Sequence, residues 1–297
     1  MKIGIPRSLY YYYFGDFWIK FFEYLNIETI VSPETNKEIL DLGLKYSVDE
    51  MCLSLKNYIG HVAYLKDKCD YILIPRIDNY GIDNQTCTNF LATYDIINNM
   101  FNVNILNYNI NLNNNETEFK GFISMSNILN IDKNQIKKAY VYSKEECSKI
   151  RTKKILDNTK KLNSKNKKVL LVGHSYNIYD KFIGMPIISM LKKLNIEVIY
   201  SDLFLGGDES KKYADGLYWK YSKENISGIS KAINNIDGII FLSTFPCGLD
   251  SLVNELVMRK LDKPYINIIL DDNSISGGIE TRIESFIDII CANGNTL

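Results

Sequence analysis

The two halves of the sequence repeat one pattern of segments. Near the N-terminus, the short apolar run 2–5 is followed by an aromatic-rich helical stretch and then by the tetrapeptide Leu-Asn-Ile-Glu at residues 25–28. In the second half, the apolar run 168–172 precedes another helical stretch, and the same tetrapeptide returns at residues 194–197. Short apolar runs that alternate with helical stretches are typical of parallel strands joined by crossover helices. The repeat therefore predicts the α/β class, with two Rossmann-like parallel-sheet domains of similar topology.

Two polar stretches separate these halves. Residues 109–119 are rich in asparagine, and residues 132–161 are charged, with apolar residues spaced as in an amphipathic helix or helix pair. We therefore predict an N-terminal α/β domain over residues 1–112, a helical connector over residues 113–165 and a C-terminal α/β domain over residues 166–297. Because open parallel sheets bind ligands beyond the carboxyl ends of their strands, functional residues are expected at those edges.

The charge balance argues against several functions. The 297 residues include 35 Lys and Arg and 35 Asp and Glu, so the formal net charge is zero. A nucleic-acid backbone or an anionic membrane surface requires a basic face, and no apolar run approaches the roughly 20 residues that span a bilayer. The first strand is expected to begin at Lys2, with no charged-then-apolar leader before it. We therefore expect a cytoplasmic protein that binds neither nucleic acid nor membranes.

The cysteines are the residues that most need an explanation. In a cytoplasmic chain of this size a disulfide framework is not expected. No two cysteines form a C-x-x-C pair, which disfavours zinc ribbons, ferredoxin-type runs and thioredoxin-type redox pairs. Taken singly, each is expected to be a small buried apolar residue or an unreactive thiol. The six are Cys52, Cys69, Cys87, Cys147, Cys247 and Cys291.

Three of the six are predicted near strand ends or helix starts. Cys247 lies between an apolar strand and a helix, and Cys87 lies in the loop after the strand that ends at Pro75. Cys52 falls in the first turns of a helix whose predicted N-cap is Ser47. The positive end of a helix favours a thiolate or an anionic cluster. Three such thiolates can hold three irons of a cubane iron–sulfur cluster or, with an exogenous ligand, a zinc ion. The remaining three cysteines fit a structural role better.

Other side chains are weaker candidates. His174 directly follows the apolar run 168–172, which makes it a candidate general acid or hydrogen-bonding group, with a structural histidine as the alternative. Arg76 follows a strand and can hold a carboxylate or phosphate, or pair with a nearby aspartate. Neither a P-loop nor a G-x-G-x-x-G motif is present, which disfavours nucleotide hydrolysis and dinucleotide redox chemistry.

Short motifs along most of the chain resemble one known family. They include Ile5-Pro6-Arg7, Glu50-x-Cys52, Ile74-Pro75-Arg76 with the Thr86-Cys87 loop, Gly173-His174-Ser175-Tyr176, Phe245-Pro246-Cys247-Gly248-x-Asp250-Ser251 and Leu270-Asp271-Asp272. Over about residues 1–290 the chain resembles the 2-hydroxyacyl-CoA dehydratase iron–sulfur proteins. It is most similar to their short, activase-related members.

This resemblance implies a cofactor, a site and partners. In the family, three cysteines per subunit bind a [4Fe–4S] cluster in a cleft between α/β domains, and the matching positions are Cys52, Cys87 and Cys247. Related members hold a double-cubane cluster, which is the alternative cofactor. The implied partners are an ATP-dependent activator (activase) that supplies low-potential electrons, a homologous subunit or second copy, and acyl-CoA as a candidate ligand. The implied chemistry is dehydration of a 2-hydroxyacyl-CoA or reduction of a related small molecule.

The residues and the family resemblance together leave three functions open. The first is an iron–sulfur enzyme component, either a dehydratase-like lyase or a reductase, driven by the activator. The second is a non-catalytic electron relay or accessory partner that serves a larger enzyme. The third is an α/β ligand-binding protein without a cluster, whose cysteines belong to the core.

Overall fold

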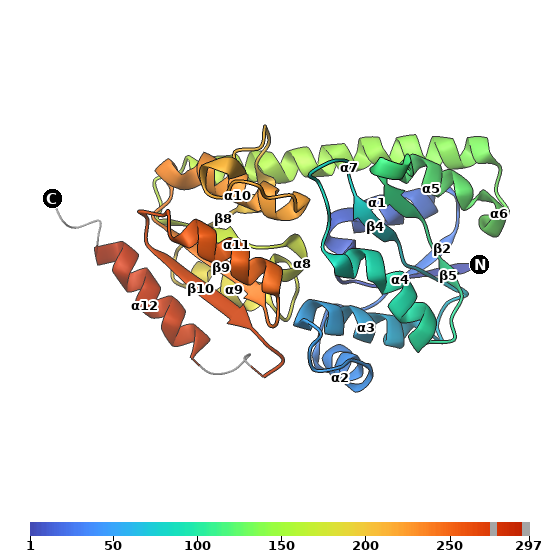
Figure 1. Cartoon of the computed structure of the whole chain (residues 1–297), viewed down its shortest axis with the longest axis horizontal. Coiled ribbons are helices and arrows are strands. Elements are labelled where there is room, and N and C mark those ends of the chain that lie inside the picture. Colours follow the sequence, from blue (N-terminus) through green and yellow to red (C-terminus); the bar gives the residue numbers. More distant parts are fainter. Residues whose placement is uncertain (274–277, 293–297) are drawn as a thin grey trace. The chain divides into compact units, whose positions relative to one another are not determined.

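Residues 1–273 and 278–292 are described by the computed structural model, and they fall into two units (Figure 1). Unit 1 comprises residues 1–151 together with residues 218–220, and unit 2 comprises residues 152–217 and 221–297. The chain passes from one unit to the other within helix α7 (Lys133–Leu162). This helix lies inside the segment that the sequence predicts as a helical connector.

Unit 1 is built on a four-stranded parallel sheet in the order β2-β1-β3-β5, and a separate pair, β4 and β6, forms a second small parallel sheet. In the main sheet, Ile3 of β1 lies opposite Tyr71 of β3. The elements are β1 (Lys2–Ile5), α1 (Tyr11–Tyr24), β2 (Glu28–Val31), α2 (Lys37–Tyr46), α3 (Leu53–Leu65), β3 (Tyr71–Leu73), β4 (Arg76–Asn79), α4 (Thr88–Met100), β5 (Ile105–Leu106), β6 (Asn109–Asn111), η1 (Leu112–Asn114), α5 (Glu118–Ser124) and α6 (Ser126–Leu129).

Unit 2 is built on a four-stranded parallel sheet in the order β10-β9-β7-β8. Its described elements, after α7, are β7 (Lys168–Val172), α8 (Ser175–Ile178), α9 (Gly184–Lys193), β8 (Glu197–Tyr200), η2 (Ser201–Leu203), η3 (Ser210–Lys212), α10 (Lys220–Ala232), η4 (Ile233–Asn235), β9 (Gly238–Thr244), α11 (Gly248–Met258), β10 (Tyr265–Leu270) and α12 (Ile279–Ala292). Numbered within each unit, both main sheets have their strands in the order second, first, third, fourth. The predicted α/β class, with parallel sheets of similar topology, is confirmed.

The repeated tetrapeptide forms the same turn in both units. Asn26 and Asn195 have φ angles of 53° and 59°, in the left-handed region. After Asn26, the N–H of Ile27 donates to the carbonyl of Phe22 at 2.9 Å, and the corresponding bond after Asn195 is also 2.9 Å. This is a Schellman helix end, in which asparagine tolerates the left-handed position better than most residues. The tetrapeptide therefore ends α1 in unit 1 and α9 in unit 2, and it begins the second strand of each main sheet.

Aromatic side chains join the helices on one face of the unit 1 sheet. The rings of Phe17 and Phe21, from α1, lie edge-on to Phe122 of α5, with centroids 5.0 and 4.7 Å apart. Tyr140 of α7 packs edge-on against Phe17 at 5.4 Å. Each fully buried aromatic ring contributes about 1.5–3 kcal/mol of hydrophobic stabilisation. The aromatic stripe predicted for the first helix is thus the core of this layer.

Helices α2 and α3 approach each other closely enough that their backbones touch. A Cβ atom on Gly43 of α2 would lie 2.2 Å from the carbonyl oxygen of Lys56, and one on Gly60 of α3 would lie 2.1 Å from that of Ile39. Only glycine fits at both positions without moving a helix. The crossing therefore fixes the position of α3, which begins directly after Cys52.

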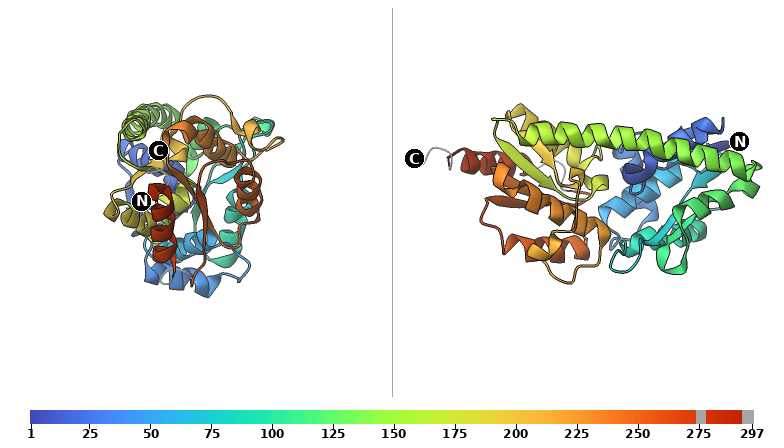
Figure 2. Two further views of the ribbon diagram at one scale, coloured as in Figure 1. Left: turned by 90° about the vertical axis from the view of Figure 1, so that its left-hand side faces the viewer. Right: turned by 90° about the horizontal axis from the view of Figure 1, so that it is seen from above.

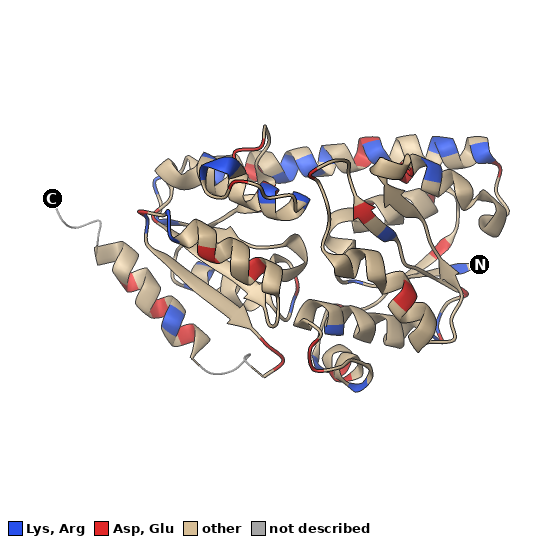
Figure 3. Ribbon diagram, viewed as in Figure 1, with Lys and Arg blue, Asp and Glu red and all other residues tan. Residues whose placement is uncertain are grey.

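Helix α7 is continuous over 30 residues and faces solvent along most of its length (Figures 2 and 3). Its first half packs through Ile136 and Ala139, which are fully buried, while lysine and acidic side chains cover the exposed faces. Among the described residues, no helix is both long and apolar enough to cross a membrane.

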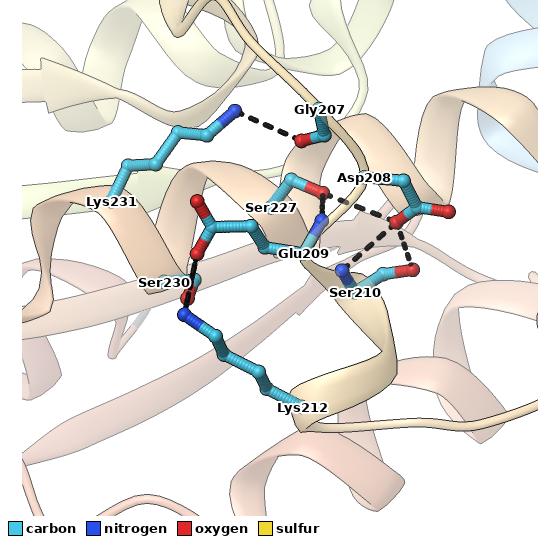
Figure 4. Close-up of polar contacts among 8 residues, drawn as sticks. All are labelled: Gly207, Asp208, Glu209, Ser210, Lys212, Ser227, Ser230 and Lys231. Atoms are coloured by element: carbon cyan, nitrogen blue, oxygen red, sulfur yellow. Dashed lines mark hydrogen bonds and ion pairs between the residues drawn. The ribbon is translucent and has the colours of Figure 1, made fainter.

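In unit 2, a polar cluster fastens the loop before α10 to that helix (Figure 4). Asp208 accepts from the backbone N–H of Ser210 at 2.9 Å, and the backbone N–H of Glu209 donates to Ser227 at 3.0 Å. Lys231 donates to the carbonyl of Gly207 at 3.2 Å. Burial opposes ionisation of Asp208, but the hydrogen bonds from Ser210 and the charge of a nearby lysine outweigh it and lower the pKa of this carboxyl. These hydrogen bonds hold the loop in place against α10.

Candidate functional site

All three cysteines predicted to bind a cluster are N-cap residues of helices. Cys52 precedes α3, Cys87 precedes α4 and Cys247 precedes α11. These three helices have 13, 13 and 11 residues, so each places its first backbone N–H groups and the positive end of its dipole at its cysteine. All three thiols are partly exposed. Each position therefore favours negative charge on sulfur, whether as a thiolate or as a cluster ligand.

The helix at Cys52 begins later than predicted. Ser47 is the C-cap of α2, and its buried hydroxyl has no hydrogen-bond partner among the residues that the structure describes. Residues 48–51 form a turn. The prediction of a Ser47 N-cap was therefore wrong, because the extended backbone of Cys52 (φ −64°, ψ 149°) starts the helix instead. Cys52 therefore lies at the N-terminal end of α3 and not within the first turns of a helix.

In unit 1, Cys52 and Cys87 come to the same edge of the sheet. The side chain of Asn89, in the first turn of α4, donates to the sulfur of Cys52 at 3.7 Å. Because crossover helices run antiparallel to the strands, the N-termini of α3 and α4 both lie at the carboxyl edge. This is the edge at which open parallel sheets bind ligands.

The loop that carries Cys87 is fastened at two points. The backbone N–H of Thr86 donates to the carbonyl of Asp78 at 2.9 Å, and its hydroxyl donates to that of Ile77 at 2.6 Å. One residue earlier, Gln85 pairs in parallel with Trp219, through backbone hydrogen bonds of 2.8 and 2.9 Å to the residues on either side of Trp219. A segment distant in sequence thus holds the loop in place.

In unit 2, three polar side chains meet beyond β7 and β9, which are neighbouring parallel strands. The backbone N–H of Asp250 donates to the sulfur of Cys247 at 3.4 Å, and the Asp250 carboxylate accepts from Nε2 of His174 at 2.9 Å. The His174 ring stacks on Tyr176 with centroids 4.9 Å apart. His174 Nδ1 and Asp250 Oδ2 are both buried, and neither has a hydrogen-bond partner among the described residues. Buried polar atoms without partners are rare, and they call for an explanation at a functional edge.

His61 is a structural residue. It is fully buried, with Nδ1 2.8 Å from the Ser32 hydroxyl and Nε2 3.0 Å from the Thr35 hydroxyl. Burial, together with the positive charge of Arg7, lowers the pKa of His61 to about 3. Its imidazole is therefore neutral at physiological pH, and both of its nitrogens are occupied.

The other cysteines lie elsewhere. The thiol of Cys69 contacts the carbonyl of Leu65 at 3.4 Å and packs against Gly4 of β1, and burial raises its pKa to about 11. Cys147 lies in α7, and Cys291 is exposed in α12. The high pKa of Cys69 makes it a poor thiolate, in keeping with the structural role expected for it.

Cys52 and Cys87 belong to unit 1 and Cys247 belongs to unit 2. Within residues 1–273 and 278–292, no group of three or more His, Cys, Asp or Glu side chains is arranged to hold a metal ion. Binding of a cluster by these three cysteines together stays a prediction. Two polar neighbours, Asn89 and Asp250, escaped the sequence analysis as functional residues, although each lies only two or three residues after a cysteine.

Comparisons with solved structures include three distant likenesses. An NtrC family transcriptional regulator from Clostridium acetobutylicum is 12% identical, with a TM-score of 0.21, covering 99% of this chain and 98% of that one. A LacI family transcriptional regulator from Arthrobacter sp. FB24, in complex with lactose, is 10% identical, with a TM-score of 0.22 and coverage of 98% and 89%. A sugar transporter from Clostridium phytofermentans is 12% identical, with a TM-score of 0.20 and coverage of 98% and 93%. Scores this low support no statement about fold or function.

No curated protein matches the chain significantly. The sequence model of one family does match, over residues 2–204, which include β1 to η2 and two of the three N-cap cysteines. This match extends over more than half of the chain and agrees with the activase-related part of the resemblance. The chain belongs to the family described as "CoA enzyme activase uncharacterised domain (DUF2229)".

Proposed function

We propose that this protein is an iron–sulfur component of a CoA-enzyme activation system, and that Cys52, Cys87 and Cys247 hold a [4Fe–4S] cluster. The observation that carries the proposal is that these three cysteines occupy the N-cap positions of three separate helices. Of the other three, two lie within helices and Cys69 packs against the central strand. The family description supports a role beside CoA enzymes.

The donor set fits the chemistry of such a cluster. Iron–sulfur clusters are held by cysteine thiolates, and their potentials respond to hydrogen bonds at sulfur and to nearby charge. Here the Asn89 amide and the Asp250 N–H both donate to ligand sulfurs, and helix dipoles add positive potential. When bound, the cluster would accept and pass single electrons. The residues around it would set its potential and its exposure to solvent.

The proposed electron donor is an ATP-dependent activator. Neither a P-loop nor a dinucleotide-binding motif is present in this sequence, so ATP hydrolysis is assigned to the partner. A homologous subunit or a second copy of this chain is the other proposed partner. A double-cubane cluster shared between copies is the alternative cofactor.

His174 is proposed as the proton-handling or hydrogen-bonding group of the unit 2 edge. A carboxylate only accepts hydrogen bonds, so the Nε2–H group of His174 donates to Asp250. This leaves Nδ1 of His174 available to a ligand. Asp250 acts as a positioning residue, because it holds both His174 and the N-terminal turn at Cys247. In the neutral imidazole Nδ1 accepts a hydrogen bond, and in the protonated form it donates a proton.

The cysteine assignment is tested by substitution under anaerobic conditions. Cys52→Ser, Cys87→Ser and Cys247→Ser should each lose most of the iron and acid-labile sulfide, while the matched controls Cys69→Ser and Cys147→Ser should keep it. Equal retention in all five variants would show that the thiols at the helix starts are not the ligands.

Catalysis is tested separately, with wild-type protein that retains its cluster. Reduction by activator and ATP, followed by incubation with a panel of 2-hydroxyacyl-CoA esters, should yield dehydrated product if the protein is a lyase component. His174→Gln should then lower turnover while leaving the iron content unchanged. Reduction without product across the panel would favour an electron relay over a lyase.

A further inference from the structure

Two arginines follow neighbouring strands at the centre of the unit 1 sheet. The tripeptide Ile-Pro-Arg occurs at residues 5–7, directly after β1, and at residues 74–76, directly after β3. These strands pair in parallel, and the sheet order β2-β1-β3-β5 places the topological switch point between them. Ligands of open α/β sheets bind beyond the carboxyl ends of the strands at such a point. Arg7 and Arg76 therefore stand at the position that the topology favours for a ligand.

In the part of the chain that the structure describes, Arg7 has no carboxylate counterion. Its Nε is buried and has no hydrogen-bond partner within residues 1–273 and 278–292, and its charged group lies over the ring of Tyr11 at 5.4 Å. Partial burial of an unpaired charge and an unpaired N–H group costs free energy. An anion bound at this guanidinium would offset that cost.

A buried hydrogen-bond network holds Arg7 in place. The backbone N–H of Arg7 donates to the Ser32 hydroxyl at 2.8 Å, and Ser32 is bonded in turn to His61. Because the low pKa of His61 keeps its ring neutral, the network brings no second positive charge beside Arg7. The guanidinium is thus anchored by its backbone and by Tyr11 before any ligand arrives. Such preorganisation lowers the entropy cost of binding.

Arg76 is built in a similar way, but its charge is partly balanced. It lies over the ring of Tyr94 at 4.4 Å, and its Nε is also buried with no hydrogen-bond partner in the described part of the chain. One of its terminal nitrogens pairs with the Asp95 carboxylate at 2.7 Å. Arg76 therefore retains donors for a second contact, with a weaker net attraction than Arg7.

We propose that the carboxyl ends of β1 and β3 form a binding site for the oxyanion of a small molecule, either a carboxylate or a phosphate. Arg7 is the principal donor and Arg76 the second. The planar guanidinium fork suits both oxyanions, because each presents two oxygens to two parallel N–H donors. The site does not depend on a cluster, and it would stand if the cysteines proved to be structural.

The first experiment uses wild-type protein labelled with ¹⁵N-arginine. The chain has five arginines, Arg7, Arg76, Arg151, Arg259 and Arg282, so its Nε–H spectrum is simple enough to assign. Inorganic phosphate and acetate are titrated separately at constant ionic strength, with chloride as the control. The Arg7 signal should shift saturably with one or both oxyanions, and that of Arg76 should shift less. The exposed Arg259 should not shift. The oxyanion that binds more tightly shows whether the natural ligand presents a phosphate or a carboxylate group to this site.

The second experiment measures affinity by calorimetry, with the tighter of the two oxyanions. Arg7→Gln should weaken binding by about 10- to 100-fold, since charge-assisted hydrogen bonds are lost. Arg7→Lys keeps the charge but not the planar guanidinium fork. Its affinity for the oxyanion should therefore lie between those of Arg7→Gln and wild type. The matched control Arg259→Gln removes the same charge from an exposed helix and should leave the affinity unchanged. Equal weakening by Arg7→Gln and Arg259→Gln, or equal shifts with chloride in the wild-type spectrum, would overturn the proposal.

Discussion

The two main sheets share a strand order but end in different chemistry. Two residues beyond the first strand, unit 1 has Arg7 and unit 2 has His174. Three residues beyond the third strand, unit 1 has Arg76 and unit 2 has Cys247. At these two positions unit 1 therefore has two guanidiniums, and unit 2 has an imidazole and a thiol. The shared topology therefore places functional side chains at equivalent positions, whereas the residue types after each strand determine their chemistry.

The two histidines show the same contrast. His61 has both nitrogens bonded within the core of unit 1, whereas His174 has one nitrogen bonded and one unpartnered. A residue whose polar atoms are all satisfied contributes to stability. A residue with an unpartnered polar atom can use that atom to bind a ligand. This difference can be tested by unfolding measurements, beginning with the largest expected effect.

Replacing His61 should destabilise the protein far more than replacing His174. In His61→Ala, Ser32 and Thr35 each lose a buried hydrogen bond and a cavity is left, so the free energy of unfolding should fall by about 3 kcal/mol. His174→Ala removes one bond at an edge where Nδ1 is already unpartnered, and should cost about 1 kcal/mol. Urea denaturation at pH 7 measures both. Equal losses in the free energy of unfolding would contradict the distinction between a structural His61 and a His174 that is available to a ligand.

Acid should destabilise the protein through His61. The pKa of His61 is lowered to about 3 in the folded chain, against about 6.5 when unfolded. Between these values the unfolded chain binds the extra proton, so this contribution is present above pH 6.5 and is lost as the pH falls. The slope approaches about 1.4 kcal/mol per pH unit. Carboxylates with lowered pKa values, such as Asp208, act in the same direction.

The difference between wild type and His61→Gln isolates the histidine contribution from that of the carboxylates. Urea titrations at several pH values from 7 to 4 should show a shallower dependence in the variant. Parallel curves for the two proteins would contradict the assignment of a buried, neutral His61.

The smallest effects test what the two units have in common. Asn26→Ala and Asn195→Ala each place a Cβ-bearing residue that lacks a local polar group in the left-handed region, and each should cost about 1 kcal/mol. Asn26→Gly and Asn195→Gly are the controls and should cost little, because glycine adopts this region freely. Losses of similar size at both positions would support equivalent turns. A loss at one position alone would break the structural equivalence of the repeat.

Local patterns predicted the fold and part of the site. The repeated tetrapeptide and the apolar runs led to the strands and to their shared order, and the three cysteines near helix starts proved to be N-caps. These features depend on residues close together in the sequence. The helix at Cys52 was placed too early, because Ser47 and Glu50 match a capping pattern that the extended backbone of Cys52 overrides.

Contacts between distant residues could not be predicted. The pairing of His174 with Asp250 spans 76 residues, and that of Cys52 with Asn89 spans 37. The pairing of Gln85 with Trp219 joins a loop to a segment from the other half of the chain. Such contacts follow from the packing of strands and helices, which no local pattern encodes. The unpartnered atoms of Arg7 and His174 became visible only with that packing.

The most direct test of the central claim is the metal content of wild-type protein purified without oxygen. If Cys52, Cys87 and Cys247 hold a cubane cluster, the protein should be brown and contain about four irons and four acid-labile sulfides per chain, with a charge-transfer absorption that bleaches on reduction. A colourless protein that takes up neither iron nor sulfide on anaerobic reconstitution would contradict the claim, and would leave three N-cap thiols with no cluster to bind.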